Sequence, residues 1–253
     1  MLTNRTTIYI SGANGNLGAE IMNRLISRTE TRVVKLKRDS NNSYLKNLSD
    51  SKRINQSSGE MLIHCGWDVV NRHIDNQRIC FAETESLSEF CSINGIKMVF
   101  ISSTSASVEA RSNYGIMKYR AERAVVNRGG LVLRPGLVLF QSPKGIQRQI
   151  NSLNQLRISF KITPDIQISV IDIDHLLDEV ESLVKESRKL GVFDCLGNKT
   201  TSLNALTGAA NVKSKVVITI PLSLMMLLLR FCGRMNTRIR NMHDSMKGVT
   251  WVA

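Results

Sequence analysis

The sequence has few acidic residues and few aromatic residues. Its 21 Asp and Glu are outnumbered by 34 Lys and Arg, so the formal net charge is +13 at pH 7 and the isoelectric point lies near 9.9. Such a basic surface attracts anionic partners, which include nucleotide phosphates, nucleic acids and acidic membranes. Aromatic residues make up only 5% of the chain, and no nucleic-acid recognition motif is present. We therefore expect no nucleic-acid partner.

The sequence also lacks the cysteine spacing of a disulfide framework or a zinc site. The five cysteines are odd in number, and no two have Cys-x-x-Cys spacing. Most lie in apolar stretches, where a free thiol behaves as a small hydrophobic side chain. This pattern favours a reducing compartment and gives no reason to expect a metal. Because residues 1–5 lack an apolar signal-peptide core, we expect a cytoplasmic location.

No apolar run is long enough to span a bilayer as a helix, which takes about 20 residues. The run at residues 216–229 has 14 residues and contains Pro221. We expect apolar and basic helices from about residue 216, and two interpretations stay open. They close a substrate lobe as buried helices, or they lie on the anionic inner surface of a membrane. The basic residues that follow the run are Arg230, Arg234, Arg238, Arg240 and Lys247.

Short apolar runs alternate with helical patterns along the first 140 residues. This alternation predicts an α/β fold, a Rossmann-type doubly wound parallel sheet with helices on both faces. Residues 39–59 are polar, with no clear period, and predict a loop with about one helical turn. The expected strands are residues 6–11, 32–36, 61–65, 96–102 and 131–134, and the expected helices are residues 17–27, 71–94 and 114–127.

The pattern is looser beyond residue 140. We divide the chain into a dinucleotide-binding core at residues 1–140 and a mixed C-terminal part at residues 141–253. The C-terminal part is expected to contribute to the core and to form a small substrate subdomain. Its expected elements are a strand at residues 167–171, a helix at residues 173–189 and a strand at residues 191–196.

A glycine-rich turn follows the first expected strand. The spacing is Gly-x-x-Gly-x-x-Gly, between an apolar strand and an amphipathic helix. Glycines permit a tight turn, a close approach of backbone N–H groups to phosphate, and close packing of helix on strand. The helix N-terminus offers unpaired donors to a pyrophosphate. The residues expected to bind a dinucleotide here are Gly12, Asn14, Gly15, Asn16, Leu17 and Gly18.

The end of the second expected strand bears on the choice of dinucleotide. Sites for NAD(H) usually place a carboxylate here, on the ribose 2′-hydroxyl. The chain instead has Lys37 and Arg38, which can pair with a 2′-phosphate and favour NADP(H). Asp39 is the competing candidate, so NAD(H) stays open.

A hydroxyl, a phenol and an ammonium follow the fourth expected strand. Tyr114 and Lys118 are four residues apart on an expected helix and share one of its faces. We expect the ammonium to lower the pKa of the phenol, which can then exchange a proton with a carbonyl or alcohol oxygen. Thr104 is the first choice for a hydroxyl that orients this oxygen, since Ser102 and Ser103 lie nearer the strand end.

With these motifs in this order, the chain resembles the extended or atypical short-chain dehydrogenase/reductases, the NAD-dependent epimerase/dehydratase family. The resemblance implies that Thr104, Tyr114 and Lys118 form the family's proton-transfer group. It also implies that Cys65 and Gly66 lie beside the cofactor and Pro135 beside the nicotinamide, and that a homodimer forms through the helix bearing Tyr114. The similar stretches are residues 10–18, 62–66, 99–104, 114–118, 133–139 and 170–176.

The chain departs from the family pattern in ways that narrow its expected function. Residues 39–59 show no acidic residue equivalent to the one that contacts adenine, and only nine residues separate Thr104 from Tyr114. No additional carboxylate pair of the kind a dehydratase uses is evident near Thr104. The resemblance therefore implies reduction or epimerisation of a sugar nucleotide or related sugar, in surface-polysaccharide synthesis. The alternative is a non-catalytic NAD(P)-binding sensor on the same fold.

Other polar residues receive structural interpretations. His64 is expected to be a hydrogen-bonded core histidine, and Trp67 to pack near the pocket. Asp172 and Asp174 precede a helix and are expected to cap it. Asn76 falls where the family has an asparagine that helps a proton relay.

Overall fold

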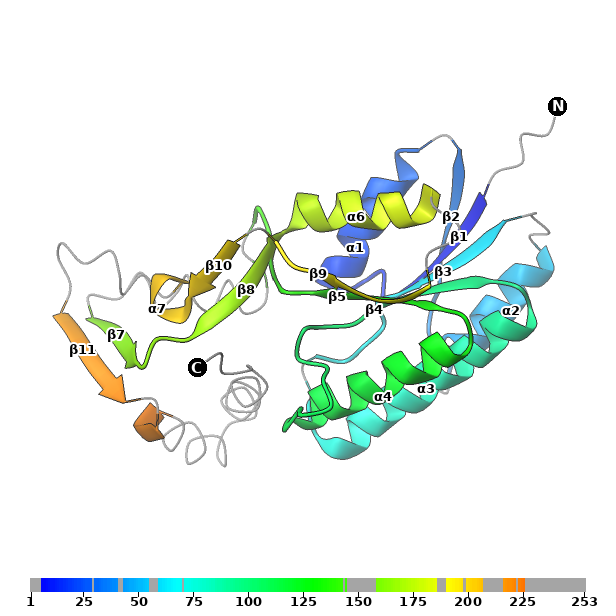
Figure 1. Ribbon diagram of the computed structural model, residues 1–253. Coiled ribbons are helices and arrows are strands. Elements are labelled where there is room, and N and C mark those ends of the chain that lie inside the picture. The colour runs from blue at the N-terminus through cyan, green and yellow to red at the C-terminus, as the bar shows by residue number, and fades with distance from the viewer. Residues whose placement is uncertain are drawn as a thin grey trace.

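A six-stranded parallel sheet with helices on both faces makes up the larger part of the molecule (Figure 1). This confirms the doubly wound Rossmann-type sheet expected from the sequence. The computed structural model describes residues 6–28, 30–40, 43–54, 59–69, 71–142, 144, 158–185, 190–197, 199–206, 216–221 and 223–225.

The strands of the large sheet run in the order β2-β1-β3-β4-β5-β9, and every neighbouring pair is parallel. The chain passes from β1 to the edge strand β2 and then returns to place β3 on the other side of β1. The direction of winding reverses there, and doubly wound sheets bind ligands at the carboxyl ends of the strands at such a point. The strands are β1 (Thr6–Ser11), β2 (Thr31–Lys35), β3 (Glu60–His64), β4 (Lys97–Ile101), β5 (Leu131–Pro135) and β9 (Gly191–Cys195).

Helices cover the two faces of this sheet (Figure 1). On one face, here the α1–α6 face, lie α1 (Asn16–Ile26) and α6 (Ile173–Lys185). On the other, the α3–α4 face, lie α3 (Ile74–Ile93), α4 (Asn113–Asn127) and the shorter α2 (Leu45–Ile54). Strand residues alternate between the two cores, so Ile8 and Ile10 pack toward α1 and α6 while Tyr9 packs toward α3 and α4.

Helix α2 corrects the expectation of a loop with about one helical turn at residues 39–59. Leu48, which belongs to this helix, is fully buried, and Tyr44, just before the helix, is 7% exposed. Because Ser, Asn and Lys residues surround these two, the sequence shows no clear apolar period. Packing on α3 stabilises the helix nonetheless. Within the described residues β2 is the edge of the sheet, and β3, the strand that follows α2, pairs with β1.

The C-terminal part adds β9 to the large sheet and builds two small sheets beside it. One has the order β10-β8-β6, and the other pairs β11 with β7 in parallel. Ile162 and Ile166 form a small buried cluster between these elements. The elements are β6 (Leu137–Leu139), β7 (Ile158–Thr163), β8 (Gln167–Asp172), β10 (Lys199–Ser202), α7 (Leu203–Leu206) and β11 (Val216–Pro221).

The start of the apolar run at residue 216 is a strand, so the expected helix from about residue 216 is wrong there. The first five residues of β11 are all β-branched, which favours a strand, and the strand pairs with β7 along its whole length. Among the described residues, no helix is long and apolar enough to cross a membrane. The basic residues expected on a membrane surface, Arg230, Arg234, Arg238, Arg240 and Lys247, lie outside the described residues.

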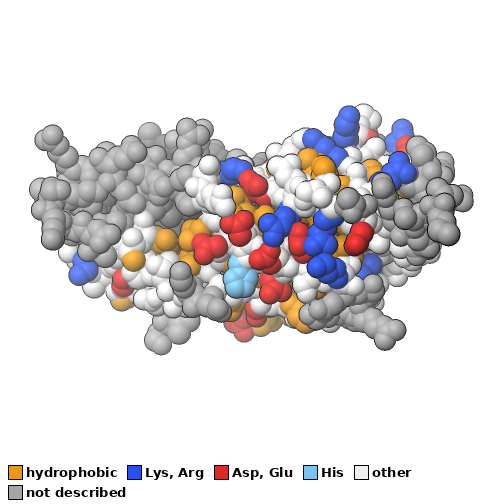
Figure 2. Space-filling view, turned by 90° about the horizontal axis from the view of Figure 1, so that it is seen from above, with side chains coloured by type: hydrophobic (Ala, Val, Ile, Leu, Met, Phe, Trp, Pro, Cys, Tyr) orange, Lys and Arg blue, Asp and Glu red, His pale blue; other side chains and the backbone are white. Residues whose placement is uncertain are grey.

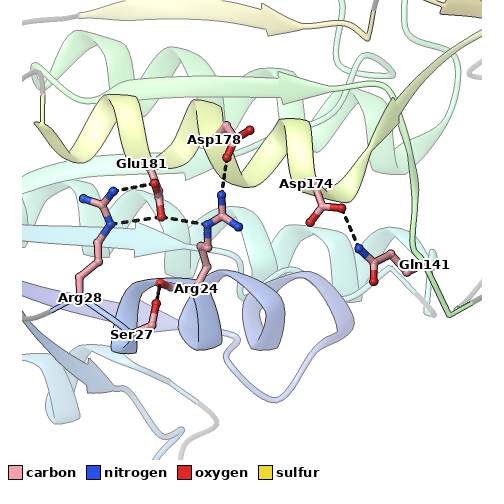
Figure 3. A network of polar contacts seen from close by, with 7 residues as sticks. All are labelled: Arg24, Ser27, Arg28, Gln141, Asp174, Asp178 and Glu181. Atoms are coloured by element: carbon pink, nitrogen blue, oxygen red, sulfur yellow. Dashed lines mark hydrogen bonds and ion pairs between the residues drawn. The ribbon is translucent and has the colours of Figure 1, made fainter.

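Ion pairs join α1 to α6 on the outside of the molecule (Figure 3). Arg24 Nε donates to Glu181 Oε1 at 2.9 Å, and the same guanidinium pairs with Asp178. Arg28 Nη2 donates to Glu181 Oε2 at 2.6 Å. Hydrogen bonding to Arg28 is the main reason that the pKa of Glu181 lies below its usual value. Figure 2, which views this face, shows acidic and basic side chains lying against one another.

Candidate functional site

The glycine turn joins β1 to α1 and packs against the end of β3. Gly12 has φ +73°, and a Cβ atom there would lie 2.7 Å from the backbone of Cys65 and Gly66. A Cβ at Gly18 would collide with the carbonyl oxygen of Gly12. The turn itself is closed by Gly15 N, which donates to Gly12 O at 2.8 Å. Two of the three glycines are therefore required by close backbone packing.

The N-terminus of α1 fits an anionic group. Gly15 is the N-cap residue, and no side chain forms a capping hydrogen bond. The first turn of the helix holds no acidic residue. Asn14, Gly15 and Asn16 are exposed, while Leu17 is partly buried. Backbone N–H groups at such an uncapped N-terminus, together with the helix dipole, attract phosphate oxygens. These residues are those that would hold the pyrophosphate of a dinucleotide.

The end of β2 presents a guanidinium at the same edge of the sheet. Arg38 Cζ lies 4.9 Å from the centre of the Tyr44 ring, and Arg38 Nη2 donates to Gly66 O at 3.2 Å. Lys37 is exposed, and its backbone N–H donates to an α2 side chain. Asp39, the competing carboxylate, accepts the backbone N–H of Ser43 at 2.9 Å and closes a turn. The structure thus gives Asp39 a local role.

Gly66 lies against the ring of Tyr44, and its expected place beside a cofactor stays a prediction. A Cβ atom at this position would lie 2.5 Å from Cε2 of Tyr44. The neighbour that demands glycine is thus a protein ring. Cys65 lies against Gly12 and is partly buried, and burial raises the pKa of its thiol to about 12. The Cys65 thiol is therefore neutral where it packs against the turn.

Tyr114 lies in the first turn of α4, whose N-cap Ser112 accepts Gly115 N at 3.1 Å. Its side chain is 8% exposed. Ser103 is the hydroxyl that acts on the phenol and lowers its pKa, whereas Thr104 is exposed and bonds through its backbone N–H to Pro135 O at 3.2 Å. Thr104 as the orienting hydroxyl therefore stays a prediction, and Ser103 is a residue the sequence analysis did not assign.

The expected direction of the Tyr114 pKa is wrong. Burial raises the pKa above the usual phenol value, and the positive charge of Arg72 and the hydroxyl of Ser103 oppose that rise only in part. Lys118, which we expected to lower it, is not among the charges that act strongly on the phenol. The reason lies in the surroundings of Lys118.

Lys118 lies beneath α4 among aromatic rings and is 2% exposed. Its Nζ donates to Ile101 O at 2.8 Å and lies 4.6 Å from the ring centre of Phe100 and 4.9 Å from that of Trp67. The Tyr114 ring centre is farther, at 5.6 Å. Burial lowers the pKa of the amine to about 7, against the charge of Glu122, which raises it. Near pH 7 the amine is therefore only partly protonated.

The loop after β3 brings Trp67 and Arg72 to this site, and hydrogen bonds with Gln77 of α3 hold this loop in place. Gln77 is fully buried; its Oε1 accepts Trp67 Nε1 at 2.8 Å, and its Nε2 donates to the backbone oxygens of Asp68 and Asn71. The sequence analysis missed Gln77, although an amide among the apolar positions of a helix was the available signal. Asn76, expected in a proton relay, donates to Asp68 Oδ2 at 3.0 Å and holds the same loop.

Ser102 leaves a polar atom unpaired at the edge of the site. Its residue is 5% exposed, and its Oγ has no hydrogen-bond partner among the described residues. Alternation along β4 places it on the side of Phe100, toward α4, next to the Ile101 carbonyl that Lys118 binds. A buried hydroxyl without a partner is costly, so it is a candidate to receive a polar group of a bound molecule.

His64 is a core residue, as expected. It is fully buried; Ser11 Oγ lies 2.5 Å from its Nδ1, and Thr84 Oγ1 lies 3.0 Å from its Nε2. Because the Thr84 hydroxyl donates to Cys80 O at 2.8 Å, it accepts from Nε2–H, and Ser11 donates to Nδ1. Burial lowers the pKa of His64 to about 3, so the ring is neutral and unsuited to proton exchange with a ligand.

A cavity of about 690 Å³ lies elsewhere, between the end of β6 and the start of α6. Its lining includes Asp172 and Asp174 but none of the residues proposed to bind cofactor or exchange protons. Asp174 accepts Gln141 Nε2 at 2.8 Å, which ties the segment after β6 to α6 (Figure 3). A series of contacts elsewhere links Gly12 through Cys65, Gly66 and Trp67 to Tyr114, the residue expected to exchange a proton.

No family model matches the chain, and a search of curated proteins gives no similar sequence. Solved structures do resemble it. A dTDP-4-dehydrorhamnose reductase from Bacillus anthracis, in complex with NADP, superposes with a TM-score of 0.68 at 17% identity, over 87% of this chain and 85% of that chain. A UDP-N-acetylglucosamine 4-epimerase from Bacillus cereus gives a TM-score of 0.68 at 13% identity, over 86% of each chain.

A third similar structure is the Bordetella bronchiseptica enzyme WbmG in complex with NAD and UDP. Its TM-score is 0.66 at 13% identity, over 85% of this chain and 81% of that chain. At such identities the comparison establishes the fold. The chain has the fold of the extended short-chain dehydrogenase/reductases, as the resemblance of its motifs implied.

Proposed function

We propose that the chain belongs to the extended short-chain dehydrogenase/reductase family and is an NAD(P)-dependent oxidoreductase or epimerase. Its substrate would be a keto or hydroxyl group of a sugar nucleotide or related sugar. The observation that carries the proposal is the series of contacts that links the glycine turn, through Cys65 and Gly66, to Trp67 and Tyr114. The fold is shared with proteins named as sugar-nucleotide reductases and epimerases, which supports the substrate class.

The proposed chemistry assigns the proton to Tyr114. A bound nicotinamide cofactor supplies or accepts a hydride. Tyr114 gives its phenolic proton to the carbonyl oxygen during reduction, or takes a proton from the alcohol in the reverse direction. Ser103, which lowers the pKa of the phenol, and Thr104 on the same loop are the hydroxyls available to hold the reacting oxygen. An epimerase uses the same group in both directions.

We propose NADP(H) as the preferred cofactor. Arg38, with its guanidinium over the Tyr44 ring, and the exposed Lys37 give the end of β2 a positive charge that suits a 2′-phosphate. Asp39, which could serve an NAD(H) ribose, is hydrogen-bonded to Ser43 instead. Among proteins of this fold, one is solved with NADP and another with NAD, so both cofactors occur on it.

One observation favours a second candidate, a non-catalytic protein that senses NAD(P)(H). Lys118 is enclosed by Trp67 and Phe100 and bonds to a backbone carbonyl, which is a structural environment for an amine. The raised pKa of Tyr114 also departs from that of an activated phenol. A sensor would retain the glycine turn and bind the cofactor without turnover.

The test compares the parent with Tyr114→Phe, and uses Tyr119→Phe on the same helix as a control. Binding of NADPH and NADH is measured by titration calorimetry, and turnover is followed as NADPH oxidation with 4-keto sugar nucleotides. We expect NADPH to bind more tightly than NADH, and Tyr114→Phe to lower turnover by about 10³-fold with unchanged NADPH affinity. The Tyr119→Phe control should retain parental turnover.

Each other result has a distinct meaning. Retained turnover in Tyr114→Phe refutes the role of the phenol. Cofactor binding by the parent without turnover on any sugar nucleotide supports the sensor. Absence of NADPH and NADH binding removes both candidates, and tighter binding of NADH overturns the cofactor preference.

A further inference from the structure

Arg72 is the charged residue that lies over the Tyr114 ring. Its Cζ is 4.7 Å from the ring centre, within the range of a cation–π contact. We propose that Arg72 is a positioning residue for Tyr114: its guanidinium orients the ring and stabilises the phenolate, the role that the sequence assigned to Lys118. The proposal rests on the proposed function, in which Tyr114 is the acid/base.

Arg72 is held through its side chain and through its backbone carbonyl. Arg72 Nε donates to Val69 O at 3.2 Å, and Asn113 of α4 donates from Nδ2 to Arg72 O at 3.5 Å. The loop before it is held by Gln77, which is buried and donates to two of its carbonyls. A cation held in this way needs little reorganisation when charge develops beside it.

The charges around Tyr114 come from several elements. Arg72 from the loop after β3 and Ser103 from the loop after β4 lower the pKa of the phenol. Cys80 of α3 and Glu122 of α4 raise it. Lys118 of α4, whose Nζ is 5.6 Å from the ring centre, is the other cation. Arg72 is therefore the charge that opposes burial most strongly.

Arg72 and Lys118 differ in whether they keep their charge. Burial lowers the pKa of Lys118 to about 7, so its amine is largely neutral by the pH at which a phenol ionises. A guanidinium stays protonated throughout this range. Of the two cations, only Arg72 carries a full positive charge when Tyr114 becomes a phenolate.

The charge on Arg72 matters because of the proton balance of the reaction. In reduction, a hydride forms a C–H bond at the carbonyl carbon, and the phenolic O–H bond breaks as its proton passes to the carbonyl oxygen. The product is an alcohol, and Tyr114 is left as a phenolate. A cation 4.7 Å from the ring centre stabilises that anion. In the direction of oxidation, the same cation favours the phenolate that accepts the proton.

The experiment measures Tyr114 ionisation directly in the full chain. Labelling with ¹³Cζ-tyrosine gives signals for the four tyrosines, and the signal lost in Tyr114→Phe identifies Tyr114. The variants are Arg72→Met, Arg72→Gln and Arg72→Lys. The control is Arg78→Met, which removes an equal charge from α3 at a residue that is exposed and paired with Asp75.

We expect Tyr114 to ionise at higher pH in Arg72→Met and Arg72→Gln than in the parent, with Arg72→Lys in between and Arg78→Met unchanged. Turnover at neutral pH should fall about tenfold in Arg72→Met, and the KM for NADPH should stay the same. Arg72→Lys should restore part of this loss. Far-ultraviolet circular dichroism checks folding, and the glutamine and lysine variants carry the test if the methionine variant unfolds.

Two results would overturn the proposal. One is an unchanged Tyr114 titration in the Arg72 variants, and the other is an equal change in Arg78→Met, which would indicate a net-charge effect. A shifted titration in a protein whose parent turns over no sugar nucleotide leaves the Arg72–Tyr114 interaction established and refutes the proposed function. The two failures are thus distinguishable.

Discussion

The two faces of the large sheet use charged residues in opposite ways. On the α1–α6 face, the ion pairs of Arg24 and Arg28 with Glu181 lie at the surface, where the arginine side chains are 37% and 22% exposed (Figure 3). On the α3–α4 face, Glu122, Lys118 and His64 are 1%, 2% and 0% exposed. Polar groups on the first face hold helices together from outside, whereas those on the second lie inside the core.

The difference indicates where the protein gives up stability for function. Surface ion pairs contribute on the order of 0–1 kcal/mol each and can be changed at little cost. Burying a charge costs several kcal/mol unless its partners are complete. The α3–α4 face nevertheless holds buried ionisable side chains near Tyr114, and this concentration is typical of a functional site.

The largest effect is expected from the ion pair on the α3–α4 face between Arg134, which is 21% exposed, and the buried Glu122, which is 1% exposed. Arg134 of β5 donates from Nε to Glu122 Oε1 at 2.8 Å and from Nη2 to Glu122 Oε2 at 2.5 Å. Arg134→Met leaves Glu122 buried without its partner, and should lower the free energy of unfolding by about 3–5 kcal/mol. Urea denaturation followed by circular dichroism measures this change.

A double variant separates the lost pair from a general disturbance. Glu122→Leu in the Arg134→Met background removes the unpaired carboxylate and should restore more than half of the loss. A loss below about 1 kcal/mol in Arg134→Met would place this pair with those of the surface and remove the contrast between the two faces.

The next effect is a loss of stability in acid that comes from His64. Its pKa is lowered from 6.5 to about 3 in the folded protein, so the unfolded chain binds its proton first as the pH falls. The stabilisation from the neutral ring is complete above pH 6.5 and is lost between pH 6.5 and about 3. The free energy of unfolding should therefore drop by about 2 kcal/mol between pH 7 and pH 5.

Histidine variants on the two faces test whether His64 causes this pH dependence of the free energy of unfolding. His64→Gln removes the titrating ring from the α3–α4 face and should flatten the pH dependence of unfolding in this window. His175→Gln removes an exposed histidine of α6 and should leave it unchanged. Equal slopes in the parent and in His64→Gln would show that other groups cause the acid sensitivity.

Features that depend on local sequence could be predicted, whereas features that depend on packing between distant segments could not. Strands such as Thr6–Ser11 and the helix Asn16–Ile26 are visible because their apolar periods are local. The glycine turn is visible because its spacing reflects local backbone packing. Helix α2 was missed because two buried residues, Leu48 and Tyr44, lie among polar ones, and β11 because its pairing with β7 is remote in sequence.

The sequence predicted where the site residues lie along the backbone, but it predicted their protonation states only in part. Tyr114 and Lys118 share a face of α4, as their spacing indicates, but burial decides their protonation. Burial and the arrival of Arg72 from the loop after β3 both depend on tertiary packing, which no spacing along α4 records. The effect of Ser103 on the phenol was not predicted for the same reason, since the loop conformation after β4 decides which hydroxyls come near it.

The smallest effect is expected on the α1–α6 face. Arg24→Met removes the contacts of Arg24 with Glu181 and Asp178, but Arg28 still donates twice to Glu181. Because these side chains are partly exposed, the free energy of unfolding should fall by less than about 1 kcal/mol, and 1 M salt should reduce the difference. Urea denaturation at low and high salt measures both. A loss as large as that in Arg134→Met would mean that the α1–α6 ion pairs stabilise the fold as strongly as the buried pair does, and that burial does not distinguish the two faces.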